Sequence, residues 1–258
     1  MRSRLAILAA LLVATASACT AQAELNHQGD LVVRFDSELV PKRLPRHRPA
    51  PIAVTVSGDV KTKKDGQLPQ LREIAVAINR SGKLYDRGLP TCRLESIQPA
   101  TEAAARRICG DAIVGHGEVT VTAAIDTQSS FAVEGKLLAF NGPRQHGRKL
   151  ILAQVYTKDP PGAFVLTFKI IRRGGLYGTV MKTTLPKRAW GWAYLTHFSM
   201  TLHRVYRQGG RRRSLLSAAC SAPAGFPGAV FPFAKATYGF DTGHRLTTTV
   251  VRSCKVQG

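Results

Sequence analysis

The segment "RVYRQGGRRRSLL", Arg204 to Leu216, places five arginines around a Gly–Gly pair. Guanidinium groups bind phosphate and carboxylate groups through paired hydrogen bonds. Two adjacent glycines favour a type I′ hairpin turn, because both central residues of that turn need a positive φ. The resulting register places Arg207 opposite Arg212 and Tyr206 opposite Arg213, a cation–π geometry. Arginines directly opposite each other repel unless solvent or a bound anion separates them.

Residues suited to catalysis or metal binding form no recognised motif. The sequence has no G-x-S-x-G, HExxH, Walker A or GxGxxG pattern. His197 and His203 would lie about 20 Å apart on a strand and cannot share a metal. His116 and Glu118 have no third ligand nearby in sequence. We therefore expect no metal, cofactor or catalytic residue, although a fold can bring a glycosidase carboxylate pair together without any local signature.

An aromatic stripe occupies one face of a further segment. In "WGWAY", Trp190, Trp192 and Tyr194 share the parity of an extended strand. The same parity continues to Phe198 and Met200. A face that stays apolar over this length is typical of a core, and the alternative is a platform that stacks on sugars or bases.

The charge favours anionic partners. The formal net charge is +21, and removal of a leader that carries Arg2 and Arg4 lowers it to +19. From Pro160 onward, Asp241 is the only acidic residue among fifteen lysines and arginines. Such a field attracts anions over long range, although a general basic composition would give the same total. No zinc finger, RNP1 motif or basic helix of a nucleic-acid-binding module is present.

The first 23 residues have the form of a signal peptide. "MRSR" is basic, "LAILAALLV" is apolar but too short to span a membrane, and an Ala-x-Ala site ends at Ala23. "ASAC" resembles a lipobox, so lipidation of Cys19 is an alternative. We expect a secreted or extracellular protein with no transmembrane segment in the mature chain.

Four cysteines remain after the leader, and four cysteines allow three disulfide connectivities. We favour Cys92–Cys109 and Cys220–Cys254. In the loop-entropy model each bridge would stabilise the fold by about 3–4 kcal/mol. No CxxC pair indicates zinc.

The rest of the chain reads as one β-rich domain. Residues 24–50, with "VPKRLPRHRPAP", predict a flexible, extended segment. Residues 51–258 then contain short runs rich in Val, Ile, Thr, Phe and Tyr with turn signals between them. One short helix is expected near 101–109, capped by Thr101 and ended by Gly110. The pattern predicts an all-β, antiparallel sandwich, with a β-barrel as second choice.

A simple up-and-down order from Gly135 onward would bring the turns "NGPRQHGR", "RRGG", "RQGGRR" and "DTGHR" to one end. The same count places Cys220 and Cys254 together at the other end, which supports their pairing. His146 and His244 lie in these turns. The arginines gathered there, our predicted anion-binding residues, are Arg144, Arg148, Arg172, Arg173, Arg207, Arg211, Arg212, Arg213 and Arg245.

Three stretches together resemble a group of conserved, exported actinobacterial proteins with no assigned activity. They are "AINRSGKLYDRGLPTCRLESIQPATEAAARRICGDAIVGHG", "YGTVMKTTLP" and "RRRSLLSAACSAPAGF…SCK". The resemblance extends from about Pro51 to the end and implies export and paired cysteines.

These patterns favour a non-catalytic binding or structural protein of the cell envelope or extracellular space. Its expected partners are anionic wall polymers, phospholipid headgroups or nucleic acid, bound at the basic turns. The alternative is a hydrolase that acts on envelope glycans or lipids.

Overall fold

The computed structural model describes residues 23–64, 68–124, 129–185 and 193–257. These residues form mostly β-strands, with one α-helix, α1 (Glu102–Cys109), and two 3₁₀ helices, η1 (Leu94–Ser96) and η2 (Gly110–Ala112). The strands are β1 (Glu24–Gln28), β2 (Leu31–Val40), β3 (Arg43–Leu44), β4 (Ala50–Pro51), β5 (Ala53–Thr62), β6 (Leu71–Asn79), β7 (Gly82–Leu84), β8 (Ile113–Ala123), β9 (Phe131–Gln145), β10 (Arg148–Lys158), β11 (Pro161–Arg172), β12 (Tyr177–Thr184), β13 (Ala193–Leu202), β14 (Val205–Gln208), β15 (Arg211–Ser214), β16 (Leu216–Ala218), β17 (Gly228–Phe240) and β18 (Arg245–Val256).

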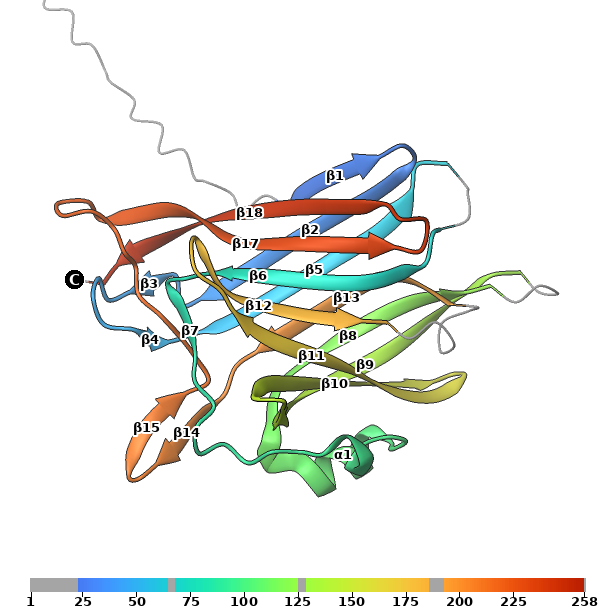
Figure 1. Cartoon of the computed structure of the whole chain (residues 1–258), viewed down its shortest axis with the longest axis horizontal. Helices are drawn as coiled ribbons and strands as arrows, with labels where there is room; N and C mark the ends of the chain where they lie inside the picture. Colours follow the sequence, from blue (N-terminus) through green and yellow to red (C-terminus); the bar gives the residue numbers. More distant parts are fainter. Residues whose placement is uncertain (1–22, 65–67, 125–128, 186–192, 258) are drawn as a thin grey trace, which may run out of the picture.

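One thirteen-stranded sheet, in the order β1-β2-β5-β13-β8-β9-β10-β11-β12-β6-β17-β18-β3, contains most of the strands (Figure 1). The sheet curls so that β18 returns to β1 and β2. Asn26 Nδ2 donates to the Thr247 carbonyl at 2.7 Å, and Arg252 Nε donates to the Ser37 carbonyl at 2.6 Å. The predicted all-β, antiparallel fold with one short helix is confirmed. The two facing layers are halves of one continuous sheet.

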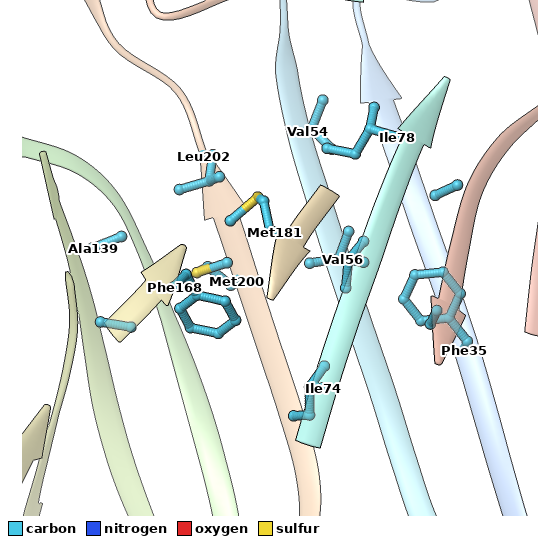
Figure 2. Close-up of a cluster of buried hydrophobic side chains, with 14 of the residues drawn as sticks. Phe35, Val54, Val56, Ile74, Ile78, Ala139, Phe168, Met181, Met200 and Leu202 are labelled. Atoms are coloured by element: carbon cyan, nitrogen blue, oxygen red, sulfur yellow. The ribbon is translucent and has the colours of Figure 1, made fainter. Parts of the chain in front are cut away.

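The main core lies between these two halves. In β5, Val54, Val56 and Val60 are buried, while the residues between them are only partly buried. This alternation directs every second side chain inward. Figure 2 shows Val54 and Val56 of β5 near Ile74 and Ile78 of β6, with Met181 and Met200 beside them.

A second, smaller core explains why β9 and β10 are apolar on both faces. Leu138, Phe140 and Leu152 point away from the main core and pack against the segment that contains α1. Gln154 Nε2 donates to the Ile97 carbonyl at 3.0 Å and to the Ala100 carbonyl at 2.7 Å. The outer face of these strands is therefore covered rather than exposed to solvent.

Both predicted disulfides are present. The Cα atoms of Cys92 and Cys109 are 5.6 Å apart, and those of Cys220 and Cys254 are 5.7 Å apart. The first bridge joins α1 to the preceding loop. Thr101 caps α1, since its hydroxyl accepts a hydrogen bond from the Ala104 amide at 3.2 Å.

The predicted up-and-down count is wrong after β15. β16 does not cross the large sheet but pairs with β4 and β7 in a small sheet of three strands. β17 therefore runs in the direction opposite to the predicted one. Its residue Ala234 pairs with Ile78, next to the Asn79–Tyr177 pair, so β17 starts at the end of the sheet that carries the β11–β12 turn. Cys220 and Cys254 consequently lie at the end of the sheet that carries the β11–β12 turn, not at the opposite end.

The segment 24–50, which the sequence predicts to be flexible and extended, contains β1, β2 and β3. Val33 and Phe35 of β2 are completely buried in the main core. The Pro- and Arg-rich composition describes only the part after β2. The apolar alternation of "LVVRFDSELV" is a strand signal that this composition obscures.

The predicted leader, its cleavage site after Ala23 and Cys19 fall in or at the edge of residues 1–22, outside the described residues. Within the described ranges, no helix has the length and apolar character needed to cross a membrane.

Candidate functional site

Two adjoining surface hollows collect part of the predicted arginine set. One has a volume of about 660 Å³ and is lined by the cations Arg80, Lys83, Arg172, Arg212 and Arg213. The other, of about 420 Å³, is lined by the cations Arg144, Arg148, Lys149 and Arg172. Arg172, Leu84 and Thr179 line both, so we name the two together the basic hollow.

Four parts of the fold bring these cations together: β7 with the turn before it, the β9–β10 turn, the β11–β12 turn and the β14–β15 hairpin (Figure 1). The hairpin has the predicted turn, since Gly209 and Gly210 have φ values of 54° and 73°. Its register also confirms the prediction, with Arg207 opposite Arg212 and Tyr206 opposite Arg213.

The aromatic partner of Arg213 differs from the predicted one. The guanidinium carbon lies 5.6 Å from the centroid of the Tyr85 ring. The Tyr206 hydroxyl instead donates to the Arg87 carbonyl at 2.8 Å. Tyr85 follows β7 directly, so these contacts fix the hairpin against the loop after β7 and direct Arg213 into the basic hollow.

Lys149 lies at the floor of the basic hollow and is only 8% exposed. Its ammonium group contacts Asp86 at 2.6 Å, and Asp86 also lies 3.7 Å from Arg144. Burial lowers the pKa of Lys149, Asp86 opposes this change, and Arg144 and Arg172 add to the lowering by repulsion. The floor therefore has more positive charge than its carboxylate neutralises.

The other predicted arginines do not line this site. Arg173, Arg207 and Arg211 line neither part of the basic hollow. Arg245 lies at the opposite end of the sheet, where it pairs with Glu73 at 2.8 Å, because β17 and β18 run in the direction opposite to the predicted one. The structure therefore brings Arg144, Arg148, Arg172, Arg212 and Arg213 together and places Arg245 elsewhere, while anion binding by these arginines stays a prediction.

Sequence reasoning missed three cations of the basic hollow: Arg80, Lys83 and Lys149. Arg80 and Lys83 belong to "NRSGK", a turn signal between β6 and β7. Lys149 follows the β9–β10 turn. Each stands next to a turn at the same end of the sheet, so a correct strand order would have identified them.

A separate hollow of about 1240 Å³ lies on the outer face of β2, β5, β13 and β8. There His197 Nδ1 and Asp59 Oδ1 are 2.7 Å apart across neighbouring strands. Within the described ranges, the bond to Asp59 is the one hydrogen bond of the His197 ring, and Ser130 lines the same hollow. The described residues also contain no cluster of three metal-ligating side chains.

The aromatic stripe lies partly outside the described residues, which omit Trp190 and Trp192. The remainder does not keep one parity. Leu195 and Met200 are both buried, because a register shift between Leu195 and His197 moves the inward face by one residue. Tyr194 therefore does not share a face with Phe198 and Met200.

No protein-family model, curated protein or solved structure matches this chain. The resemblance to exported actinobacterial proteins accordingly stays a prediction.

Proposed function

We propose that this protein binds an anionic, phosphate- or carboxylate-bearing ligand in the basic hollow. The observation that carries the proposal is the convergence of Arg172, Arg212, Arg213 and Lys149 from separate elements on one pair of hollows. Within the described residues, Asp86 is the one carboxylate that forms ion pairs with the cations of the basic hollow. A bound anion reduces the electrostatic repulsion between cations that line the same hollow.

Wall polymers, phospholipid headgroups and nucleic acid all carry such groups. The two disulfides are typical of an oxidising compartment outside the cytosol. These disulfides support our proposal that binding takes place in the cell envelope or the extracellular space. Lipidation of Cys19 is the alternative to cleavage after Ala23.

The test is calorimetric binding of inorganic pyrophosphate by two double variants with the same change in net charge. Arg172→Ala/Arg212→Ala removes two arginines of the basic hollow. The control, Arg207→Ala/Arg211→Ala, removes two exposed arginines of the same region. We expect the first variant to weaken binding by about tenfold or more and the control by less than about twofold at moderate salt. Equal weakening by both would show that total charge, not the hollow, attracts the anion.

The hydrolase alternative would have to use His197 and Asp59. A histidine oriented by a carboxylate through Nδ1 can act as a general base through Nε2. This candidate has weaker support, since within the described residues His197 forms no hydrogen bond to a serine or cysteine that it could activate. Turnover of ester or glycoside substrates that is abolished in both His197→Ala and Asp59→Asn would favour it over the binding role.

A further inference from the structure

The main core contains an unfilled apolar cavity of about 50 Å³ between the two halves of the sheet. Met181 of β12 and Met200 of β13 line it from opposite halves, and Met200 lies beside Phe168 in Figure 2. Valine, leucine, isoleucine and phenylalanine side chains form the rest of the lining. Such a space stays dry and accepts apolar groups.

A second cavity, of about 20 Å³, continues from the first toward the end of the sheet that carries the basic hollow. Val54, Ile78 and Leu216 line both cavities. Phe231 and Phe233 of β17 also line the second one, with ring centroids 6.2 Å apart. The two cavities are therefore neighbours that share lining residues.

The second cavity in turn adjoins the basic hollow. Gly82, Lys83, Leu84 and Thr179 line both. Thr179 and Met181 are two residues apart on β12, so they lie on the same face of the strand. From the basic hollow inward, the lining changes from arginines, past half-buried Leu84 of β7 and Thr179 of β12, to the apolar interior.

We propose that the anionic ligand is an amphiphile, a lipid whose phosphate binds in the basic hollow and whose acyl chain enters between the halves of the sheet. This inference rests on the proposed function and names the ligand class of the same site. The chain would pass Leu84 and Thr179 and reach Met181 and Met200. A cavity of 50 Å³ must widen to hold it, and unbranched, flexible methionines on both sides allow this.

The experiment compares three probes: glycerol 3-phosphate, dioctanoyl phosphatidic acid below its micelle concentration, and uncharged dioctanoylglycerol. The chain has three methionines. Two of them, Met181 and Met200, line the cavity, so methionine methyl NMR reports directly on the interior. We expect phosphatidic acid to bind about tenfold more tightly than glycerol 3-phosphate, equivalent to about two buried methylene groups, and to shift both methyl signals.

Thr179→Phe narrows the passage without changing the charge of the basic hollow. Thr237→Phe on β17 is the control, because Thr237 is a half-buried threonine that lines neither the cavities nor the basic hollow. We expect Thr179→Phe to reduce the affinity for phosphatidic acid to that for glycerol 3-phosphate, while the control keeps the difference. Because Thr179 also lines the basic hollow, the quantity compared within each variant is the ratio of its affinities for phosphatidic acid and glycerol 3-phosphate, and circular dichroism shows that each variant is folded.

The outcomes separate the two proposals. Equal affinity for phosphatidic acid and glycerol 3-phosphate, with unchanged methyl signals, overturns the amphiphile and leaves anion binding intact. No binding of either phosphate probe overturns both proposals. Dioctanoylglycerol binding as tightly as phosphatidic acid, with shifted methyl signals, overturns the role assigned to the basic hollow.

Discussion

Arg213 stacks on the ring of Tyr85, a residue 128 positions earlier in the chain, and not on Tyr206, its cross-strand neighbour. The Tyr85 hydroxyl also donates to Gln208 Oε1 at 3.1 Å. Both contacts join the β14–β15 hairpin to the loop after β7. A two-stranded hairpin alone is only marginally stable, so Tyr85 fixes where Arg212 and Arg213 point.

Replacement of Tyr85 by alanine should release the hairpin. We expect a loss of about 1–2 kcal/mol in unfolding free energy, from the cation–π contact and one hydrogen bond. Trypsin should cleave faster at Arg211, Arg212 or Arg213. Tyr85→Phe, which keeps the ring under Arg213, should behave closer to the wild type. A Tyr85→Ala protein with wild-type cleavage kinetics at the hairpin would contradict this role.

The hairpin register could be predicted from the sequence, but the partner of Arg213 could not. Two glycines determine the turn, and the turn determines which residues face each other. Tyr85 follows β7, which pairs with β16 in the three-stranded sheet, and this long-range pairing has no local signal in the sequence. The pair of His197 and Asp59 is another case, since its members are 138 residues apart.

The strands themselves were predictable, and the order of the last ones was not. β16 has three residues and two strand partners outside the large sheet. The run "RRRSLLSAA" has the composition of a strand that crosses the sheet, so counting it as one reversed every later direction. The disulfide between Cys220 and Cys254 was still predicted correctly, because the error in strand direction assigned both cysteines to the same wrong end of the sheet.

β10 illustrates a different limit. "KLILAQVY" lacks the alternation of a strand with one solvent face, which indicates cover on both sides. The covering segment contains η1, α1 and their loops, and its packing residues, such as Ile97 and Ala105, follow no single period. The sequence therefore indicates that a second layer exists without identifying it.

Lys149 should make anion binding depend on pH. Burial and the repulsion from Arg144 and Arg172 lower its pKa, which Asp86 only partly opposes. An anion favours the charged ammonium, so affinity is complete below this lowered pKa and falls as pH rises through it. With sulfate, which does not titrate here, we expect a several-fold loss between about pH 7 and pH 10. Lys149→Arg should keep its affinity over that range, and an equal decline in this variant would assign the effect to another group.

Glu73 should make the opposite end of the sheet sensitive to acid. The hydrogen bond from Lys182 holds the pKa of Glu73 below its ordinary value of 4.5, burial opposes this, and Arg245 adds to the lowering. A lowered carboxyl pKa stabilises the fold above the ordinary value, and the contribution is lost as pH falls through the lowered value. Glu73→Gln should therefore reduce the unfolding free energy by about 0.5–1 kcal/mol at neutral pH and by less at about pH 3.

The control for this prediction is Glu38→Gln. Glu38 and Lys42 form a 4.0 Å pair that is largely exposed, so its loss should leave stability unchanged at both pH values. Denaturant unfolding of the wild type, Glu73→Gln and Glu38→Gln at both pH values gives the comparison.

A third variant tests the position of Arg245. Arg245 pairs with Glu73 at a site far from the basic hollow, and Lys182 still pairs with Glu73 when Arg245 is removed. Arg245→Ala should therefore reduce stability by less than Glu73→Gln does and should bind pyrophosphate like the wild type. Weakened pyrophosphate binding in Arg245→Ala would contradict its assignment to the opposite end of the sheet.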